Sequence, residues 1–317
     1  MPTPHLSQPT RDIFEACVAA AVGAWPLVGA GDKNAVDGAA VDAMRSSLIG
    51  ANFGGIVVIG EGEKDEAPML YNGELIGQGQ PIDWDIAVDP IDGTALAAAG
   101  VPGAVAVMAA APRGGMMADP EVYYMAKIVA GPAARELLDL DLTPEQNIEL
   151  LAAALNKPIS EINVAIINKS RNFDLIQRVQ AFGANWVRFD EGDVAMAVAA
   201  ATPDSGVDLL LGMGGNPEGV VTACAVQVLG GFMQGRLWPQ TPDELSRALA
   251  AGSDIERKYE LHELASGERF VFVLTQITDG PLASGIREDG DDLLVQTFVL
   301  DSELQGAHVL EVRIPGN

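Results

Sequence analysis

The chain has 317 residues, and its hydrophobic content of 48% supports a sizeable core and excludes a wholly disordered protein. Its formal net charge of −25, from 19 basic and 44 acidic residues, argues against a nucleic-acid binder and against a basic membrane-surface protein. No apolar stretch is long and charge-free enough to span a bilayer, and Asp12 and Glu15 interrupt the place where a signal peptide needs an apolar segment. The two cysteines, Cys17 and Cys224, have no metal-ligand spacing. We therefore expect a cytoplasmic protein, in which bound divalent metal would supply any cations that an anionic substrate needs.

The N-terminal part is predicted to be helical and then to form a buried strand. Residues 10–29 read as a helix that Pro26 ends or kinks, and a second helix follows with Asp37 in its first turn. Taken alone, Asp37 is best explained by a favourable interaction with the helix dipole. Residues 54–59 predict a buried strand, and Glu61 follows it between two glycines that allow the backbone to approach a ligand closely.

The stretch from Asp83 to Thr94 organises the predicted site. Its apolar run at 86–88 predicts a buried strand that closes at Asp89, because the next residue is a proline and cannot continue a sheet ladder. A short helix should follow, so that Asp89 and Asp92 lie beside backbone N–H groups at its start. Carboxylates bind hard cations and helix N-termini bind anions, so this turn could hold a metal ion and a phosphate together. A loop with a turn and a helix cap is the alternative that the stretch alone leaves open.

The second half alternates strands with helices, which predicts a largely parallel sheet with its ligand site at the carboxyl ends of the strands. The predicted strands are 164–167, 186–189 and 207–211, and the helices 173–182, 194–201 and a third that ends at Leu229. The three strand ends carry a basic loop with Lys169 and Arg171, an acidic loop at 190–193, and a glycine-rich loop at 212–219 that contains Glu218. Lys169 and Arg171 could grip a phosphate, although a solvated basic turn is equally compatible with this feature alone.

The remaining elements surround this alternating region. Further strands are predicted at 103–112, 123–130, 270–276, 293–299 and 308–313. A connection at 131–160 contains a helix that opens at Thr143 with a capping-box sequence. Asp139-x-Asp141 is not interpreted as a calcium loop, because Pro144 stands where such a loop needs glycine.

The candidate chemistry depends on carboxylates rather than on histidine. Four carboxylates at or near strand ends and one aspartate at a helix start form an oxygen-only ligand set that suits magnesium or manganese: Asp37, Glu61, Asp89, Asp92 and Glu218. The three histidines have no ligand spacing, and the chain contains no Gly-x-Ser-x-Gly motif and no P-loop. Metal-activated water is thus the better candidate for the chemistry. A dinucleotide site at Gly212-x-Gly214 is disfavoured, since Pro217 replaces the third glycine.

Four motifs resemble those of the class II fructose-1,6-bisphosphatases of the bacterial GlpX type, in order and over nearly the whole chain. They are Gly31-Asp32-Lys33-Asn34-Ala35-Val36-Asp37-Gly38, Ile59-Gly60-Glu61-Gly62-Glu63 with Glu66-Ala67-Pro68-Met69-Leu70-Tyr71, Asp85-Ile86-Ala87-Val88-Asp89-Pro90-Ile91-Asp92-Gly93-Thr94, and Gly214-Gly215-Asn216-Pro217-Glu218-Gly219-Val220. The shorter Asp-Pro-Ile-Asp-Gly-Thr is shared with the wider lithium-sensitive sugar and inositol phosphatase superfamily.

The resemblance implies a layered α/β sugar-phosphatase fold and hydrolysis of the 1-phosphate of fructose 1,6-bisphosphate to fructose 6-phosphate, a step of gluconeogenesis. Some members also hydrolyse sedoheptulose 1,7-bisphosphate. Matching positions imply metal ligands at Asp37, Glu61, Asp89, Asp92 and Glu218, with Mg²⁺ or Mn²⁺ as the cofactor. They imply substrate-site positions at Asp92, Gly93, Thr94, Tyr124, Lys169, Arg171, Glu191, Asp193 and Gly215, and catalytic roles for Thr94, Glu61 and Asp89.

We expect an N-terminal metal-binding domain over residues 1–135 and a C-terminal substrate-binding domain over residues 136–317, in a homo-oligomer. An inositol-monophosphatase-like enzyme is the second hypothesis, and a non-catalytic sugar-phosphate sensor the third. Three departures from the family pattern stand out. Asp92 and Asn172 occupy positions where many members have Glu and His, Glu191 replaces a common Asp, and Tyr123-Tyr124-Met125 has one extra residue near the tyrosine of the family.

Overall fold

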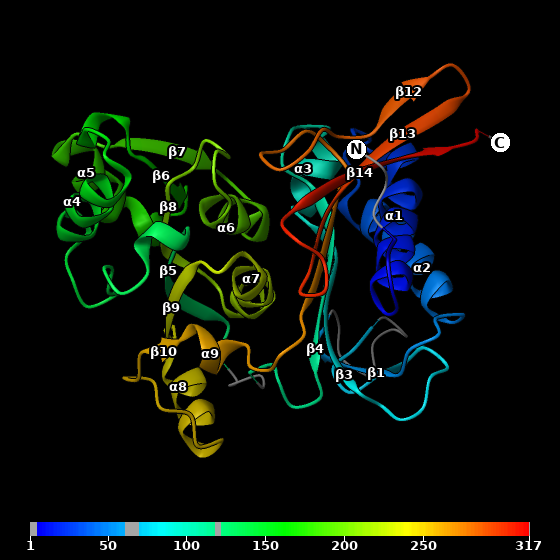
Figure 1. The fold of residues 1–317 in the computed structure, drawn as a ribbon, viewed down its shortest axis with the longest axis horizontal. Coiled ribbons are helices and arrows are strands. Elements are labelled where there is room, and N and C mark those ends of the chain that lie inside the picture. Colours follow the sequence, from blue (N-terminus) through cyan, green and yellow to red (C-terminus); the bar gives the residue numbers. More distant parts are fainter. Residues whose placement is uncertain (1–4, 61–69, 118–121, 317) are drawn as a thin grey trace. The chain divides into compact units, whose positions relative to one another are not determined.

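The structure is a computed structural model that describes residues 5–60, 70–117 and 122–316 (Figure 1). The chain divides into two compact units, the first made of residues 1–116 and 267–317 and the second of residues 117–266. This division differs from the expected boundary after residue 135, because residues 124–130 form a strand of the second sheet and the end of the chain returns to the sheet of the first unit. There β11 (Val271–Gln276) pairs along its full length with β4 (Val105–Pro112). None of the helices in the described ranges has the length and hydropathy needed to cross a bilayer.

The first unit contains one sheet whose strand order is β12-β13-β11-β4-β3-β1-β2, with β14 paired to β13. Among the described strands of this sheet, only β1 and β3 run parallel. Its elements are α1 (Thr10–Ala24), α2 (Lys33–Leu48), β1 (Gly55–Ile59), β2 (Leu75–Ile76), β3 (Trp84–Asp92), α3 (Thr94–Ala99), β4, β11, β12 (Arg287–Asp289), β13 (Asp292–Asp301) and β14 (His308–Ile314).

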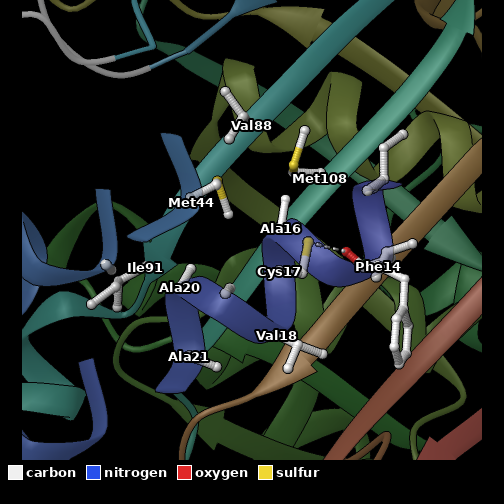
Figure 2. Close-up of a cluster of buried hydrophobic side chains, with 14 of the residues drawn as sticks. Phe14, Ala16, Cys17, Val18, Ala20, Ala21, Met44, Val88, Ile91 and Met108 are labelled. Atoms are coloured by element: carbon white, nitrogen blue, oxygen red, sulfur yellow. Dashed lines mark hydrogen bonds between the residues drawn. The ribbon is translucent and has the colours of Figure 1, made fainter. Parts of the chain in front are cut away.

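Helix α1 covers the middle of this sheet with small side chains and thereby forms the first core. Figure 2 shows Cys17 of α1 in the same cluster as Met108 of β4, Met44 of α2 and Val88 of β3. Burial raises the pKa of the Cys17 thiol, which behaves as a small apolar side chain. The predicted helix over 10–29 ends as α1 at Ala24, where a 3-10 turn that contains a proline follows.

The second unit is a mixed sheet in the order β10-β9-β5-β8-β6-β7. The prediction of parallel strands is correct for β6, which runs parallel to both β7 and β8, but β5, β9 and β10 pair antiparallel. The elements are β5 (Tyr124–Ala130), α4 (Pro144–Leu155), β6 (Asn163–Ile167), α5 (Phe173–Phe182), β7 (Asn185–Phe189), α6 (Asp193–Ala201), β8 (Leu209–Gly215), α7 (Asn216–Leu229), β9 (Phe232–Leu237), α8 (Pro242–Ala250), β10 (Tyr259–Glu260) and α9 (Leu261–Leu264).

Two strands are longer than predicted, for reasons that local sequence does not reveal. β3 continues through Pro90 to Asp92, because a register shift between Asp89 and Asp92 places the proline in a bulge, where its missing N–H is tolerated. β8 continues through the predicted glycine-rich loop to Gly215, because β5 pairs with it as far as that residue.

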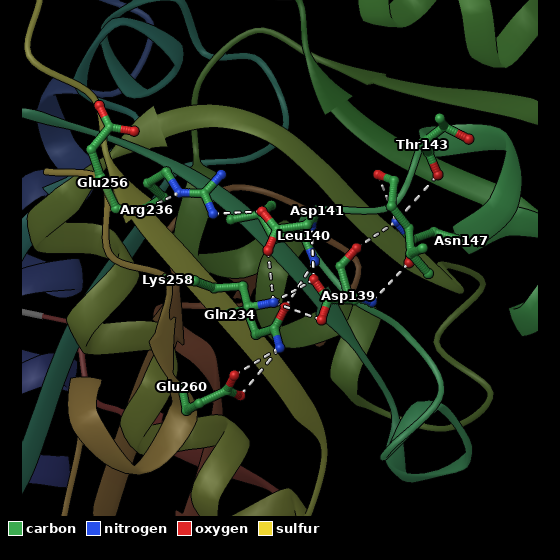
Figure 3. A network of polar contacts seen from close by, with 11 residues as sticks. Asp139, Leu140, Asp141, Thr143, Asn147, Gln234, Arg236, Glu256, Lys258 and Glu260 are labelled. Carbon is green, nitrogen blue, oxygen red and sulfur yellow. Dashed lines mark hydrogen bonds and ion pairs between the residues drawn. The ribbon is translucent and has the colours of Figure 1, made fainter.

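The connection between β5 and α4 is held by a charged network, shown in Figure 3. Lys258 lies 2.5 Å from Asp139 and 3.0 Å from Asp141, and Arg236 lies 2.5 Å from Asp141. The two aspartates thus pair with basic side chains of the same unit. Thr143 forms the reciprocal capping box that was predicted for α4.

Candidate active site

The end of β3 presents two carboxylates on one face of the first sheet. Asp89 pairs with Val107 of β4, and Asp92 with Val105. Residues 105 and 107 point to the same face of β4, since side chains alternate along a strand. Asp92 is the third residue after Asp89, which in a regular strand would place the two side chains on opposite faces, and the bulge between them removes that difference. The bulge, in which Pro90 stands, therefore places both carboxylates on the same face of the sheet.

Thr94 begins α3 directly after this strand end. Gly93, with a φ of 91°, is the N-cap residue of this helix, and Thr94 is its first helical residue. The left-handed conformation of Gly93 is one that glycine adopts without strain. The Thr94 hydroxyl donates to the carbonyl of Ile91 at 3.0 Å, which fixes the direction of its only proton.

Asp37 lies further from its helix start than predicted. α2 begins at Lys33 after Asp32, whose carboxylate accepts from the backbone N–H of Ala35 at 3.0 Å. Asp37 is therefore outside the first turn, which weakens the helix-dipole explanation because that effect falls off within one turn. The side chain is half-buried, and burial raises the pKa of its carboxyl group.

The remaining predicted ligand of this group, Glu61, lies outside the described residues. Within the described ranges, no three Asp, Glu, His or Cys side chains are close enough to form a metal site by themselves. The first unit contains Asp37, Asp89 and Asp92, and the second contains Glu218.

In the second unit, the basic loop after β6 is fixed to the end of β8. The Nε of Arg171 donates to the carbonyl of Met213 at 2.8 Å, and its guanidinium lies over the ring of Tyr124. Asn172, fully buried, accepts from the N–H of Met213 at 2.9 Å and donates to the carbonyl of Met213 at 3.1 Å. Lys169 is half-buried in the same loop. An amide can both donate and accept, so Asn172 satisfies both backbone groups of one residue.

Of the two adjacent tyrosines, it is Tyr124 that faces this loop. Tyr124 pairs with Gly215 across β5 and β8, whereas 60% of Tyr123 is exposed. Trp238 meets the ring of Tyr124 edge-on, with 6.4 Å between ring centroids. Tyr124 is thus held between Trp238 and Arg171.

The acidic loop after β7 is tied to the basic loop. Asn168 donates to Asp190 at 2.6 Å, and this bond together with Arg188 lowers the pKa of the Asp190 carboxyl. Glu191 is half-buried in the loop, and Asp193 is the first residue of α6. Strand ends β6 and β7 therefore hold their loops side by side, as parallel neighbours should.

Glu218 lies in the first turn of α7, where its carboxylate packs against Gly215. A Cβ at residue 215 would lie 1.7 Å from Oε2 of Glu218. Oε2 is buried and has no hydrogen-bond partner among the described residues. Burial raises the pKa of Glu218, and the nearby positive charge of Lys127 opposes this rise. A buried carboxylate oxygen of this kind requires a cation or a proton.

Lys127 was not predicted from the sequence. It is 1% exposed in β5, with Nζ at 2.6 Å from Asp193 Oδ2 and donating to the carbonyl of Gly215 at 2.9 Å. The signal available was a single charged residue inside the apolar strand 124–130, which a buried strand accepts only with a partner.

A metal-dependent phosphatase uses carboxylates at a strand end, a buried acid whose unpaired oxygen fits a cation, and an arginine held in place at a second strand end. Comparison with known proteins gives the family. Residues 8–313 match the family model for bacterial fructose-1,6-bisphosphatase, glpX-encoded, and the chain belongs to this family. The family implies dependence on a divalent metal and a sugar bisphosphate as substrate.

Curated relatives agree with the family model. The chain is 39% identical over 315 residues to fructose-1,6-bisphosphatase 1 class 2 of Escherichia coli K12, which covers 93% of this chain and 94% of the relative. The class 2 fructose-1,6-bisphosphatases of Escherichia coli O6:H1 and Shigella flexneri match with the same identity and the same coverage.

Proposed function

We propose that the chain hydrolyses the 1-phosphate of fructose 1,6-bisphosphate, giving fructose 6-phosphate and phosphate, with Mg²⁺ or Mn²⁺ as the cofactor. The observation that carries this proposal is the 39% identity to a fructose-1,6-bisphosphatase over 93% of the chain. The same proposal gives the chain a role in gluconeogenesis in the cytoplasm, as a homo-oligomer.

We assign metal binding to five carboxylates: Asp37, Glu61, Asp89, Asp92 and Glu218. Oxygen ligands suit hard divalent cations, and the buried Oε2 of Glu218, which has no hydrogen-bond partner within the described residues, fits a cation. Bound metal supplies positive charge that activates water and stabilises the charge at the reacting phosphate. Asp37, Asp89 and Asp92 belong to the first unit, and Glu218 belongs to the second.

Substrate binding is assigned mainly to the second unit. Lys169 and Arg171 hold the phosphate that is not cleaved, and the stacking of Tyr124 under the guanidinium keeps Arg171 oriented. Glu191, Asp193 and Gly215 are assigned to the sugar, for which carboxylates and a backbone group offer hydrogen bonds to hydroxyls. Gly93 and Asp92, in the first unit, are also assigned to substrate binding.

Three residues are assigned to the chemical step: Thr94, Glu61 and Asp89. The Thr94 hydroxyl has its proton committed to the carbonyl of Ile91, so its oxygen can accept a hydrogen bond from the attacking water. This acceptor would orient the water toward phosphorus, and orientation lowers the barrier. Glu61 and Asp89 would bind the metal ion whose positive charge activates the water.

The test is phosphate release by the purified chain from fructose 1,6-bisphosphate, sedoheptulose 1,7-bisphosphate and myo-inositol 1-phosphate, each with Mg²⁺, Mn²⁺ or a chelator. We expect turnover of fructose 1,6-bisphosphate only with metal. A preference for myo-inositol 1-phosphate would favour the inositol-monophosphatase hypothesis instead. Binding of fructose 1,6-bisphosphate without turnover under any of these conditions would favour the sensor.

A further inference from the structure

The buried ammonium of Lys127 connects three separate elements of the second unit. Lys127 lies in β5, its ion-pair partner Asp193 is the first residue of α6, and its carbonyl partner Gly215 ends β8. The distances are 2.6 Å from Nζ to Asp193 Oδ2 and 2.9 Å from Nζ to the Gly215 oxygen. Gly215 also leads into α7, whose first turn carries Glu218.

Gly214 has no side chain and so leaves room for the ion pair between Lys127 and Asp193. A Cβ at Gly214 would lie 2.0 Å from Asp193 Oδ2 and 3.0 Å from Cε of Lys127. Any side chain at position 214 would therefore displace the ion pair. The ion pair therefore depends on the absence of a side chain at position 214.

Stability alone is a weak reason for a buried ion pair. Removing two charges from water is costly, and apolar residues of similar volume often stabilise a fold as well or better. An ammonium with three donors, in contrast, can fix the direction of a carboxylate and a carbonyl at the same time. Both of its partners, Asp193 and Gly215, are substrate-site positions in the proposed function.

We propose that Lys127 is a positioning residue, which holds the Asp193 carboxylate and the Gly215 carbonyl in the orientation that binds the sugar. This inference rests on the proposed function and adds to it a residue to which no substrate contact is assigned. Lys127 orients these two groups before the substrate binds. Its loss should therefore weaken substrate binding more than it slows the chemical step.

The experiment is a double-mutant cycle of Lys127→Met, Asp193→Asn and the double variant. The kinetic readout is KM and kcat for fructose 1,6-bisphosphate, and the second readout is calorimetric binding of fructose 6-phosphate without metal. We expect Lys127→Met to raise KM and the dissociation constant at least tenfold, with kcat within about threefold. In the Asp193→Asn background the same change should have less than about a threefold effect, because residues that act through one another are not additive.

The matched control is Lys157→Met. Lys157 lies 2.6 Å from Asp208, the residue just before β8, so it forms a lysine–aspartate pair of the same length at the opposite end of that strand. We expect KM and the dissociation constant to stay at wild-type values. Gly214→Ala is a second variant, which keeps both charges and displaces the pair, and it should raise KM as Lys127→Met does even if Lys127→Met fails to fold.

The outcomes separate the two proposals. If the wild-type chain neither hydrolyses fructose 1,6-bisphosphate nor binds fructose 6-phosphate, the proposed function fails and this inference fails with it. If the wild-type chain does both, while Lys127→Met or, failing that variant, Gly214→Ala keeps wild-type KM and dissociation constant, only the role of Lys127 is overturned. Equal effects of Lys127→Met in both backgrounds would also overturn it.

Discussion

The guanidinium of Arg171 lies over the ring of Tyr124, with 4.4 Å between Cζ and the ring centroid. Its Nε donates a hydrogen bond to the Met213 carbonyl on β8. The hydrogen bond holds one edge of the guanidinium, and the tyrosine ring packs against its face. A cation braced in this way loses little freedom when it binds a phosphate, and the two terminal nitrogens are the donors that it presents.

The first prediction concerns this pair. Arg171→Ala should raise KM for fructose 1,6-bisphosphate by at least about tenfold while kcat changes less, because a phosphate that is not cleaved is bound equally in ground and transition states. Tyr124→Leu should raise KM in the same direction, and Tyr124→Phe, which keeps the ring, should have little effect. Steady-state kinetics of the three variants measures this. An unchanged KM with a collapsed kcat for Arg171→Ala would place Arg171 at the reacting phosphate.

The second prediction concerns the carboxylates at strand ends. Exhaustive chelation should abolish phosphate release, and Mg²⁺ or Mn²⁺ should restore it. Asp89→Asn and Glu61→Gln should each remove most activity without unfolding the chain, as far-UV circular dichroism would show. Asp83→Asn is the control, since Asp83 is exposed just before β3 and has no assigned role. Wild-type rates in Asp89→Asn would remove Asp89 from the metal site.

The third prediction uses the close packing of Gly215 on Glu218. The backbone at Gly215, with φ −68° and ψ 143°, is acceptable to any residue, so the effect of Gly215→Ala comes from space. Its Cβ would occupy the place of Oε2 of Glu218 and displace the carboxylate. We expect the rise in melting temperature on adding Mn²⁺ to shrink, because ligand stabilisation follows affinity. Gly50→Ala is the control, since nothing lies near its Cβ, and it should keep the full rise in melting temperature. A full rise in Gly215→Ala would show that Glu218 does not bind the metal.

The sequence predicts the elements that local pattern determines. The apolar run before Asp89, the capping box at Thr143 and the alternation that gives β6, β7 and β8 are all visible without the structure. In each case, neighbouring residues alone determine the conformation through periodicity or capping.

Features that depend on distant partners could not be predicted in this way. The bulge that brings Asp89 and Asp92 to one face follows from pairing with β4, and the return of β11 to the first sheet is a pairing across more than half of the chain. Lys127 reads as an isolated charge until Gly214 and Asp193 are placed beside it. Such contacts follow from the topology, which pattern reasoning does not supply.

The fourth prediction concerns pH and the network of Figure 3. Hydrogen bonds from Arg236 and Lys258 lower the pKa of the Asp141 carboxyl below its usual value of 3.8. A lowered pKa in the folded state stabilises the fold above pH 3.8, and this stabilisation is lost as the pH falls through the folded-state value. Because Asp141 is largely exposed, Asp141→Asn should lower the melting temperature at pH 7 by only about 2 °C.

The difference between Asp141→Asn and the wild type should disappear below the folded-state pKa and shrink in high salt, which screens exposed pairs. Differential scanning calorimetry across this pH range measures it. A difference that persists at the lowest pH would mean that Asp141 stabilises the fold by something other than its charge.

The last prediction concerns Thr94 and separates catalysis from stability. The hydroxyl donates to the carbonyl of Ile91, and this bond alone accounts for about 1 kcal/mol of stability. If the oxygen also orients the attacking water, Thr94→Ala should lower kcat by at least about tenfold, which is roughly 1.4 kcal/mol of barrier. KM and metal affinity should change little.

Two further substitutions isolate the hydroxyl of Thr94. Thr94→Ser keeps the oxygen and should retain much of the rate, whereas Thr94→Val keeps the shape, lacks the oxygen and should behave as Thr94→Ala does. Steady-state kinetics gives the rates, and urea unfolding gives the stability of each variant. If Thr94→Ala and Thr94→Val turn over normally and only unfold at lower urea, the hydroxyl serves the bond to Ile91 and takes no part in the chemical step.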